Sequence, residues 1–405
     1  MTDNKDKKVL NVPALRFPEF SGEWKEERLD EIAELSKGVG ISKEQLSEDG
    51  EPCILYGELY TKYKSEIIRK VISKTNIESS NLKRSKRNDV IIPCSGETAI
   101  DIAVARCIPF DNILLGGDLN IIRLHKDDGA FMAYQLNGKR KIDIAKLAQG
   151  VSVVHLYGEN LKSIKTYNPC LQEQQKIVKL LSMFDERIEA QNKIIEDLKK
   201  LKSAISKHLF ARKDLLETTI CLSNIATLKN GYAFQSGKYN ALGKWKILTI
   251  TNVSGERYIN DKDCNCIINL PNDIQDHQVL KEGDILISLT GNVGRVSLCK
   301  NGDYLLNQRV GLLQLAKNVN QEFLYQILSS QKFENSMIAC GQGAAQMNIG
   351  KGDVESYVLP YSSNGNNILW VAKILHSYDE CIINEMRKLT LLTMQKQYLL
   401  IQMFI

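Results

Sequence analysis

Few side chains in this sequence have the types and spacing that catalysis requires. The five histidines lie at positions 125, 155, 208, 277 and 376, and none pairs obviously with a Ser or Cys nucleophile. Asn168-Pro169 could begin the (N/D)-P-P-(Y/F) motif with which a methyltransferase holds a flipped base, but Cys170 follows it. No carboxylate pair with a lysine indicates a metal-dependent nuclease. We therefore predict no catalytic residue and no enzyme activity of the chain itself.

Nucleotide and metal sites are also not indicated. The motif G-x-x-x-x-G-K-[ST] is missing, and Gly291 and Gly294 are better explained by a tight turn after a strand. The chain has ten cysteines without any C-x-x-C pair, and only Cys264 and Cys266 are close together. Zinc needs ligands about two to four residues apart, so the pattern predicts reduced, mostly buried thiols, no metal site and no bound cofactor.

Basic and polar loop residues are the side chains whose chemistry suits a binding role. The net charge of +5 and the sequence pI near 8.5 are compatible with a polyanionic partner without requiring one. Lys and Arg neutralise phosphates, and polar loop side chains contact base edges. The residues of this kind that would contact a polyanion such as DNA are Lys62, Lys83, Arg84, Lys86, Arg87, Thr98, Arg257, Asn292, Arg295, Gln308 and Arg309.

Two long helices are predicted to position these residues. The stretch ERIEAQNKIIEDLKKLK, residues 186–202, has apolar residues at the alternating spacing of four and three that is typical of a coiled coil. The same pattern returns 194 residues later, where the polar interruptions Gln191 and Lys202 correspond to Glu385 and Lys396. The predicted seam consists of Ile177, Leu181, Phe184, Ile188, Ile195 and Leu198, and of Val371, Leu375, Tyr378, Ile382, Leu389 and Leu392.

The modules before the two helices repeat as well. The matching segments are LDEIAELSKG (29–38) with LSNIATLKNG (222–231), RNDVIIPCSGE (87–97) with EGDILISLTGN (282–292), and AQGVSVVHL (148–156) with GQGAAQMNI (341–349). Short β-branched runs such as DVIIP, NIIRL, KILTI, DILIS and VGLLQL predict strands in both modules. The predicted fold class is α+β, with two similar α/β domains separated by two long antiparallel coiled-coil helices in a pseudo-twofold repeat.

The predicted boundaries make these elements consecutive. They are a polar N-terminal tail (1–11), a first domain (12–168), a central helix (169–212), a second domain (213–360) and a distal helix (361–405). A linker of about ten residues reaches at most ~35 Å, whereas a helix of about 38 residues is ~55–60 Å long. We therefore expect the modules at opposite ends of an antiparallel rod. Two modules that differ in sequence and are held at a fixed separation suit a bipartite, asymmetric target on duplex DNA.

The start of the chain bears on localisation. The opening MTDNKDKK has no apolar segment behind its charges, and no run of about 18 apolar residues follows anywhere. We expect a cytoplasmic protein without a membrane partner.

Three segments of the chain together resemble a known protein family. The lead-in VPALRFPEFSGEWKEERLDEI (12–32), the helix at 173–210 and the degenerate second copy ending QKQYLLIQMF (395–404) resemble the specificity subunit of type I restriction-modification systems. The second helix departs from the family pattern, since Asn366-Asn367 and Trp370 replace its usual Glu/Gln-rich opening.

The resemblance implies a function and a set of partners. It implies two target recognition domains separated by two helices, no catalytic site, two methyltransferase subunits as partners and restriction subunits for cleavage. S-adenosylmethionine, ATP and Mg would belong to those partner subunits. Because the recognition domains are the variable part of the family, no base-contacting residue can be transferred. The alternatives are a single-chain nuclease or methyltransferase with an unrecognised site, and a coiled-coil adaptor that never touches DNA.

Two hypotheses concern the helices. Charged residues beside apolar ones on their outer faces predict docking of the methyltransferase subunits, and they are Glu189, Lys193, Ile194, Lys200, Leu201, Arg387 and Lys388. The length of the helices is expected to set the number of unspecified base pairs between two half-sites.

Overall fold

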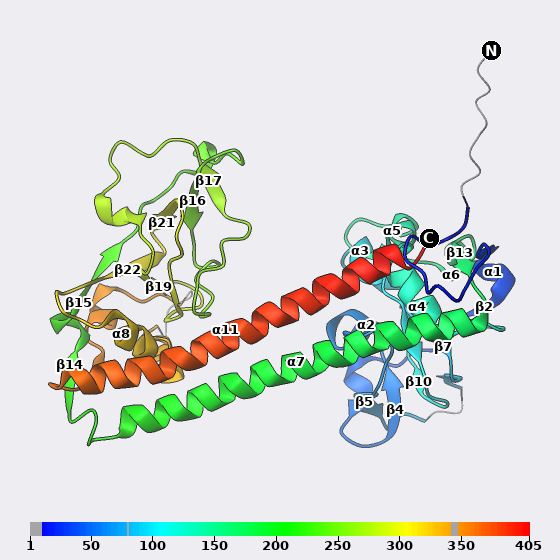
Figure 1. Ribbon diagram of the computed structural model, residues 1–405, viewed down its shortest axis with the longest axis horizontal. Coiled ribbons are helices and arrows are strands. Elements are labelled where there is room, and N and C mark those ends of the chain that lie inside the picture. The colour runs from blue at the N-terminus through cyan, green and yellow to red at the C-terminus, as the bar shows by residue number, and fades with distance from the viewer. Residues whose placement is uncertain (1–9, 79–80, 342–346) are drawn as a thin grey trace, which may run out of the picture. The chain divides into compact units, whose positions relative to one another are not determined.

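The computed structural model describes residues 10–78, 81–341 and 347–405. The chain folds into two compact units (Figure 1). Unit 1 consists of Met1–Asn192 and Lys388–Ile405, and unit 2 consists of Lys193–Arg387. Each unit therefore combines one α/β domain with part of each long helix. Most of the predicted tail, residues 1–9, lies outside the described residues.

Domain 1, the α/β part of unit 1, is built on a four-stranded antiparallel sheet. Its order is β2 (Ala33–Lys37), β11 (Leu119–Leu124), β7 (Asp89–Pro93) and β9 (Arg106–Ile108). A second sheet has the order β3 (Leu46–Ser47), β5 (Ser73–Thr75), β4 (Glu51–Ile54), β10 (Leu114–Leu115) and β6 (Lys83–Arg84). Two short ribbons pair β1 (Lys25–Arg28) with β13 (Lys165–Asn168), and β8 (Ser95–Gly96) with β12 (Val154–His155).

The helices of domain 1 are short. They are α1 (Leu29–Ile32), α2 (Glu58–Thr61), α3 (Ala99–Ile102), α4 (Gly129–Asn137), α5 (Lys141–Lys146), α6 (Gly158–Leu161) and the 3-10 turn η1 (Lys43–Gln45). The strand β7 is buried along its whole length because it lies between two other strands and under α4. This burial explains why its sequence, DVIIP, is a continuous apolar run rather than an alternating one.

Domain 2, the α/β part of unit 2, repeats the same plan. Its central sheet has the order β15 (Ala226–Asn230), β22 (Val310–Leu315), β19 (Ile285–Ser288) and β20 (Val296–Leu298). The second sheet has the order β17 (Asn265–Ile267), β16 (Trp245–Leu248), β21 (Tyr304–Leu306) and β18 (Val279–Leu280), and β14 (Thr218–Cys221) pairs with β23 (Val358–Tyr361). The helices are α8 (Gln321–Leu328), α9 (Gln331–Cys340) and α10 (Lys351–Glu355), with 3-10 turns η2 (Leu222–Asn224), η3 (Ser236–Lys238) and η4 (Asp276–Gln278).

The predicted duplication and α/β character are confirmed. The four central strands occur in the same chain order in both domains, and each second sheet contains one parallel pair, β4 with β10 and β16 with β21. All five β-branched runs singled out from the sequence lie in strands for most of their length, although β16 ends at Leu248 and leaves out the last two residues of KILTI. The helix after the last central strand is capped alike, by Asp128 for α4 and by Asn320 for α8. These caps give a common register for comparing the two domains.

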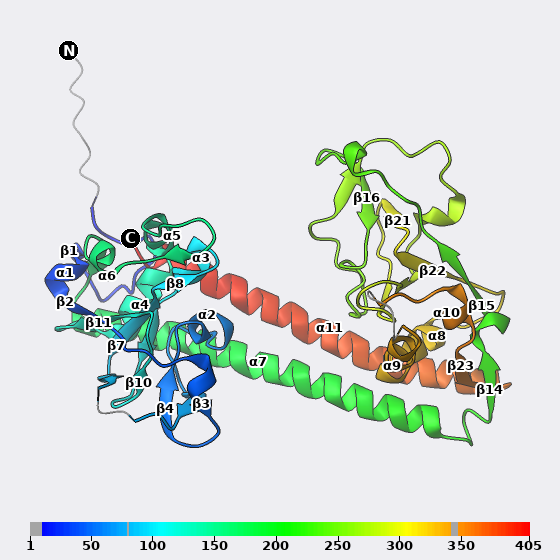
Figure 2. The same cartoon turned by 180° about the vertical axis from the view of Figure 1, so that it is seen from behind.

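The two long helices are α7 (Leu171–Ala211) and α11 (Gly365–Gln402). In unit 1 the first half of α7 packs against the end of α11, with Ile177 and Leu181 in one cluster with Leu400 and Met403. In unit 2 the end of α7 packs against the start of α11, where Leu209 shares a cluster with Val371 and Leu375 among others. The helices are thus antiparallel within each unit, as both views show (Figures 1 and 2).

The predicted seam lies on the inner sides of these helices. The side chains of Ile177, Leu181, Ile195, Val371, Leu375 and Ile382 are buried, and those of Phe184, Ile188, Leu198, Tyr378, Leu389 and Leu392 are half-buried. The unusual opening of α11 has its own cap, because the side-chain oxygen of Asn364 accepts a hydrogen bond from the backbone N–H of Asn366 (3.0 Å).

An aromatic cluster ties the end of α11 to domain 1. Phe404 lies against Trp24 and Phe131, with ring centroids 6.3 and 5.3 Å away. All three are almost fully buried. Such aromatic pairs contribute about 0.5–1.5 kcal/mol beyond the area they bury. Within the described ranges, no helix is both long and apolar enough to cross a bilayer.

Candidate nucleic-acid interface and helix junctions

In domain 2, one edge of the central sheet brings exposed polar loop residues together. The strands β19 and β22 are antiparallel, so the loop that leaves β19 and the turn that enters β22 meet at the same edge. The backbone N–H of Leu289 donates to the carbonyl oxygen of Arg309 at 3.0 Å. Asn292, Gln308 and Arg309 are exposed there. The structure thus gathers three of the predicted DNA-binding residues in one place.

Three further residues of domain 2 belong to this edge. Thr290 forms a β-bridge with Asn348, and its hydroxyl donates to the Asn348 side-chain oxygen at 3.0 Å. The N–H of Gln308 donates to the carbonyl oxygen of Tyr232 at 3.0 Å. We call the set Tyr232, Thr290, Asn292, Gln308, Arg309 and Asn348 the sheet-edge loops of domain 2.

The same edge in domain 1 carries different side chains. Ser95 stands where domain 2 has Thr290, and it pairs with His155, which stands where domain 2 has Asn348. Ser95 donates to Asp118 at 3.2 Å, and the ammonium of Lys37 lies 3.1 Å from the same carboxylate. Hydrogen bonding to Asp118 raises the pKa of Lys37. Aromatic surface is added by Tyr157, which is 55% exposed and stacks on His155.

Among the predicted DNA-binding residues of domain 1, Thr98 is the one that closely follows β8 in the chain, at this edge. Its hydroxyl caps α3, accepting from the N–H of Asp101 at 3.1 Å and donating to the Asp101 carboxylate at 2.6 Å. Lys37, Ser95, His155 and Tyr157 were not predicted. The repeat of AQGVSVVHL as GQGAAQMNI, which places His155 opposite Asn348, was the signal that could have indicated them.

The basic cluster LKRSKR lies partly in β6, an edge strand of the second sheet. Arg84 forms a two-armed ion pair with Glu51, at 2.6 and 3.1 Å. Lys86 and Arg87, on the turn between β6 and β7, are exposed, and Lys83 is half-buried.

Two other predicted cations already have carboxylate partners. The ammonium of Lys62 lies 2.6 Å from Glu58, and Nε of Arg295 lies 3.4 Å from Glu334. The exposed pair Lys86 and Arg87 is therefore better placed for phosphate contact than Lys62, Arg84 or Arg295.

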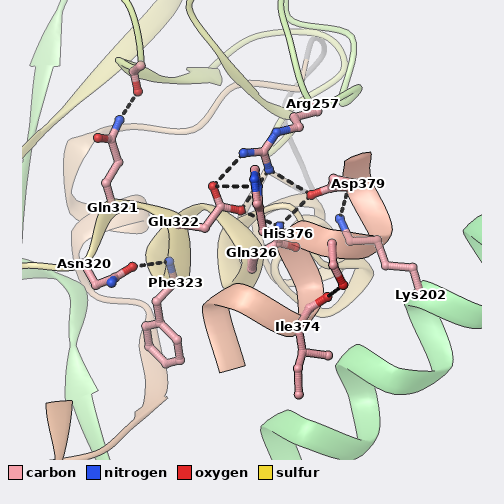
Figure 3. A network of polar contacts seen from close by, with 12 residues as sticks. Lys202, Arg257, Asn320, Gln321, Glu322, Phe323, Gln326, Ile374, His376 and Asp379 are labelled. Atoms are coloured by element: carbon pink, nitrogen blue, oxygen red, sulfur yellow. Dashed lines mark hydrogen bonds and ion pairs between the residues drawn. The ribbon is translucent and has the colours of Figure 1, made fainter. Parts of the chain in front are cut away.

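Arg257 is not placed as the sequence suggested. It is only 9% exposed, and its guanidinium pairs with two carboxylates inside unit 2. Nη1 lies 2.9 Å from both Glu322 and Asp379, and Nη2 lies 2.6 Å from Glu322 (Figure 3). Because its guanidinium is buried as well as paired, Arg257 is not available to a DNA phosphate, and we remove it from the DNA-binding set.

The cluster around Arg257 joins domain 2 to both long helices. Lys202 on α7 reaches Asp379 on α11 at 2.5 Å, and Gln326 on α8 donates to Asp379 at 2.6 Å. Burial pushes the pKa of Glu322 upward, but hydrogen bonds from Arg257 and Gln326 outweigh it and the pKa is lowered. Burial alone would lower the pKa of Arg257, yet its carboxylate partners Glu322 and Asp379 raise that pKa. We call this set the unit 2 junction.

Unit 1 has a corresponding junction. Lys396 on α11 pairs with Asp185 on α7 (2.5 Å) and with Glu66 of domain 1. The hydroxyl of Tyr134 on α4 donates to Asp185 at 2.6 Å, as does that of Ser65 at 2.9 Å. Burial raises the pKa of Tyr134 and the adjacent Asp185 charge adds to the effect. Both junctions thus couple a domain helix to an Asp–Lys pair formed across α7 and α11.

The thiols and acidic groups show no metal-binding arrangement in the part of the chain that the structure describes, where no three His, Cys, Asp or Glu side chains are grouped to hold an ion. All ten cysteines are free thiols. The prediction that they are mostly buried is wrong, because only Cys53, Cys94, Cys107 and Cys299 are buried. The other six are half-buried (Cys221, Cys264 and Cys266) or exposed (Cys170, Cys340 and Cys381). Burial raises the pKa of Cys94 and of Cys299 to about 12, which keeps both protonated.

Comparison with known proteins places these features in context. A family model described as type I restriction modification DNA specificity domain matches the chain twice, at residues 21–200 and 217–394. The type I restriction enzyme MjaVIII specificity subunit of Methanocaldococcus jannaschii is 26% identical over 359 residues, which cover 82% of this chain and 80% of that protein.

Two solved structures share the fold. The S subunit of a type I restriction-modification system from M. genitalium has a TM-score of 0.58 at 19% identity, covering 97% of this chain and 99% of its own. A chain from a study of complex assembly and conformational transition of the type I R-M system has a TM-score of 0.55 at 15% identity, covering 94% of this chain and 97% of its own.

Proposed function

Because the chain belongs to the family of type I restriction-modification DNA specificity subunits, we propose that each of its two domains reads one half of a bipartite, asymmetric duplex target. Subunits of this family recognise DNA and are themselves non-catalytic. The observation that carries the proposal is the sheet edge, which is built alike in both domains but carries different side chains. At matched positions stand Ser95 and Thr290, and His155 and Asn348. Equivalent loops with different hydrogen-bonding groups suit two different half-sites.

The proposed contacts divide by chemistry. In domain 2, base edges are read by the side-chain amides of Asn292 and Gln308. In domain 1, they are read by the hydroxyl of Thr98 and the imidazole of His155. Phosphates are met by Lys83, Lys86 and Arg87, and by Arg309. Lys62, Arg84 and Arg295 remain in the proposed set as cations that already pair with carboxylates and would have to share them.

Base and phosphate contacts are separable by experiment. Asn292→Ala and Gln308→Ala should each reduce discrimination at specific bases by about 1–3 kcal/mol. The double variant Lys86→Ala, Arg87→Ala should instead weaken binding to all sequences. It should also make the affinity less dependent on salt, with the slope of log binding constant against log salt concentration changing by about 0.9 for each phosphate that is no longer neutralised. Lys373→Ala, an exposed lysine of α11, is the matched control. Equal loss at every base in all variants would contradict the assignment of Asn292 and Gln308.

The long helices are proposed to dock two methyltransferase subunits. Their outer faces carry the exposed charges Glu189, Lys193, Lys200, Arg387 and Lys388. Large apolar side chains are exposed beside them, including Ile194 and Leu201 on α7 and Leu391, Met394, Tyr398 and Ile401 on α11. Exposed apolar residues rimmed by charge are typical of protein interfaces. Reversing the charges on one face should abolish methylation by the complex while circular dichroism shows a folded chain.

The remaining components would belong to the partners. S-adenosylmethionine would be bound by the methyltransferase subunits, and ATP and Mg by the restriction subunits that associate for cleavage. The proposed site of action is the cytoplasm, alongside the DNA that the complex modifies.

The spacing between half-sites is proposed to follow helix length. Adding one heptad near Leu198 lengthens α7 by ~10 Å, which corresponds to about three base pairs, although an unmatched α11 would transmit less. A four-residue insertion adds ~6 Å but shifts the seam as a stutter. Methylome sequencing of a host expressing each variant should show an altered gap with unchanged half-sites. Altered half-site bases with an unchanged gap would contradict the proposal.

One experiment separates this function from its alternatives. The purified chain is tested for methylation, cleavage and duplex binding, alone and with methyltransferase subunits. We expect no turnover by the chain alone and sequence-specific methylation by the complex. Turnover by the chain alone would indicate an unrecognised active site. Failure of the complex to bind any duplex would favour a coiled-coil adaptor.

A further inference from the structure

The two junctions present nearly the same helix surface to two different domains. Asp185 and Asp379 occupy equivalent positions of the repeat, and so do Lys202 and Lys396. In each unit the aspartate of one long helix pairs at 2.5 Å with the lysine of the other. All four side chains are at most 17% exposed. Each domain therefore meets one buried carboxylate and one buried ammonium.

The domain residue that faces this pair has opposite charge in the two units. Glu66 and Arg257 are structurally equivalent, because each precedes a β-bridge to an edge strand of the central sheet, Ile67 with Cys107 and Tyr258 with Leu298. Their carbonyl oxygens accept the same hydrogen bond, each at 2.7 Å, from β9 and β20 respectively. Glu66 pairs with the helix lysine, whereas Arg257 pairs with the helix aspartate.

Neighbouring residues compensate for this reversal. In domain 2 the extra positive charge of Arg257 is matched by Glu322, two residues after the cap of α8. In domain 1, the residue two positions after the cap of α4 is Ala130, which has no charge. In domain 1 a buried cation, Arg106, donates to the backbone carbonyl oxygens of Leu59 and Tyr63. Burial lowers the pKa of Arg106, and the charges of Glu66 and Asp185 oppose that lowering. The equivalent strand position in β20 is Ser297.

Each junction is attached to the sheet whose edge carries the DNA-reading loops. Tyr134 and Gln326, which bond the helix aspartates, lie on α4 and α8. These helices pack on β9 and β20, strands of the two central sheets. A sheet is stiff, so the junction sets the orientation in which the loops at its edge meet DNA. Recognition groups must be held to within about 0.5 Å to function.

We propose that the two junctions are independent positioning determinants, and that each controls how accurately its own domain reads its half-site. Glu66, Asp185 and Lys396 position domain 1, and Arg257, Glu322, Asp379 and Lys202 position domain 2. The inference rests on the proposed function, in which each domain reads one half-site. It adds that buried residues remote from DNA determine specificity, and that they do so by opposite charge arrangements.

The test uses the full-length chain in complex with its methyltransferase subunits. The target is first obtained by methylome sequencing of the wild type. Initial methylation rates are then measured on duplexes in which each base of both half-sites is substituted singly. Lys396→Met should lower discrimination at one half-site by about tenfold or more, the scale of a single base-pair mismatch, and leave the other unchanged. Arg257→Met should affect the opposite half-site.

Conservative and matched variants distinguish positioning from a general loss of structure. Lys396→Arg keeps the cation and should retain discrimination within about threefold, well under the tenfold scale of a mismatch. Lys373→Met, an exposed lysine on the same helix, should behave as the wild type. A merely structural role of Lys396 would lower the rate on all duplexes together without changing their ratios.

A graft tests the charge arrangement itself. Glu66→Arg alone adds a third cation to a junction that already holds Lys396 and Arg106, and it should impair reading of the domain 1 half-site. Adding Ala130→Glu and Arg106→Ser rebuilds the domain 2 arrangement in domain 1 and should restore discrimination. If packing alone mattered, the triple variant would be worse than the single one.

The outcomes separate the inference from the function on which it rests. A wild-type complex that methylates no bipartite motif would refute the proposed function. A bipartite wild-type motif together with equal effects of Lys396→Met and Arg257→Met on both half-sites would overturn only the inference. The same holds if both variants act on one half-site, or if the graft fails to improve on Glu66→Arg.

Discussion

The two domains share a backbone plan but are joined to the helices by opposite charges. Domain 1 offers Glu66 to the helix lysine, and domain 2 offers Arg257 to the helix aspartate. Each of these charges is paired with an opposite charge, as a low-dielectric site requires, whereas the buried cation Arg106 of domain 1 is bonded to backbone carbonyl oxygens. The repeat thus preserves geometry and charge balance, while the identity of each charged residue is free to change with its neighbours.

The difference predicts unequal dependence on the two helix lysines, and this is the largest effect we expect. Lys396→Met leaves Glu66 and Asp185 buried with their main cation removed, and it should destabilise unit 1 by about 4 kcal/mol. Lys202→Met leaves Asp379 paired with Arg257, so the loss in unit 2 should be about 1.5 kcal/mol. Unfolding in urea, monitored by hydrogen exchange of the backbone amides in α4 and in α8, reports the stability of unit 1 and of unit 2 separately. Equal losses would contradict the proposed role of Arg257 as the second cation.

The helix ends provide a second contrast. Phe404 is 2% exposed among aromatic rings, whereas its repeat equivalent Phe210 is only half-buried. Phe404→Ala should cost about 3 kcal/mol, because it leaves a cavity between Trp24 and Phe131. Phe210→Ala should cost about half as much. Thermal unfolding of both variants checks the order, and a larger loss for Phe210→Ala would show that exposure does not determine the cost here.

The hydroxyl of Tyr134 tests how much the domain helix contributes to the unit 1 junction. Tyr134→Phe removes the donor to Asp185 and keeps the ring in place. We expect a loss of about 1.5 kcal/mol, typical of a hydrogen bond to a charged group. The same measurement on Tyr167→Phe, whose hydroxyl bonds the exposed Glu26, should show a much smaller change. Similar losses for both would mean that burial of Asp185 adds nothing.

Acid sensitivity is the smallest expected difference between the junctions. The lowered pKa of Glu322 means that its contribution to stability is complete above the unfolded carboxyl value of about 4.3. That contribution is lost as pH falls through the lower folded pKa. Glu322→Gln should therefore reduce the loss of unit 2 stability that occurs below about pH 4.3. We expect this reduction to be less than about 1 kcal/mol, smaller than the contribution of a fully salt-bridged carboxylate. An unchanged acid slope would contradict this pairing.

Much of the fold was predictable because its signals are local and repeated. The 4-3 spacing of seam residues such as Ile177 and Leu181 follows from helix geometry alone. Runs such as DVIIP predict buried strands because β-branched residues suit a pleated sheet. The duplication required only that the sequence be compared with itself. These inferences need no knowledge of which distant residues meet.

The candidate sites were less predictable because a charged residue looks the same in sequence whether it is paired or exposed. Arg257 was assigned to DNA, yet in the fold it meets Glu322 and Asp379, 65 and 122 residues away. Tyr157 was overlooked because its exposure depends on the ribbon formed by β8 and β12. Asn292, Gln308 and Arg309 were chosen singly, and only the antiparallel pairing of β19 with β22 places them at one edge.

By itself, the sequence determined the two α/β modules, the two heptad helices and the family, since periodicity, β-propensity and self-similarity are properties of neighbouring residues. Tertiary structure alone decided which charged side chains are paired inside the fold and which are exposed. Lys396 reaches Glu66 across 330 residues, and Lys202 reaches Asp379 across 177. Ion pairs act through space and gain strength on burial, so their partners become known only when the chain has folded.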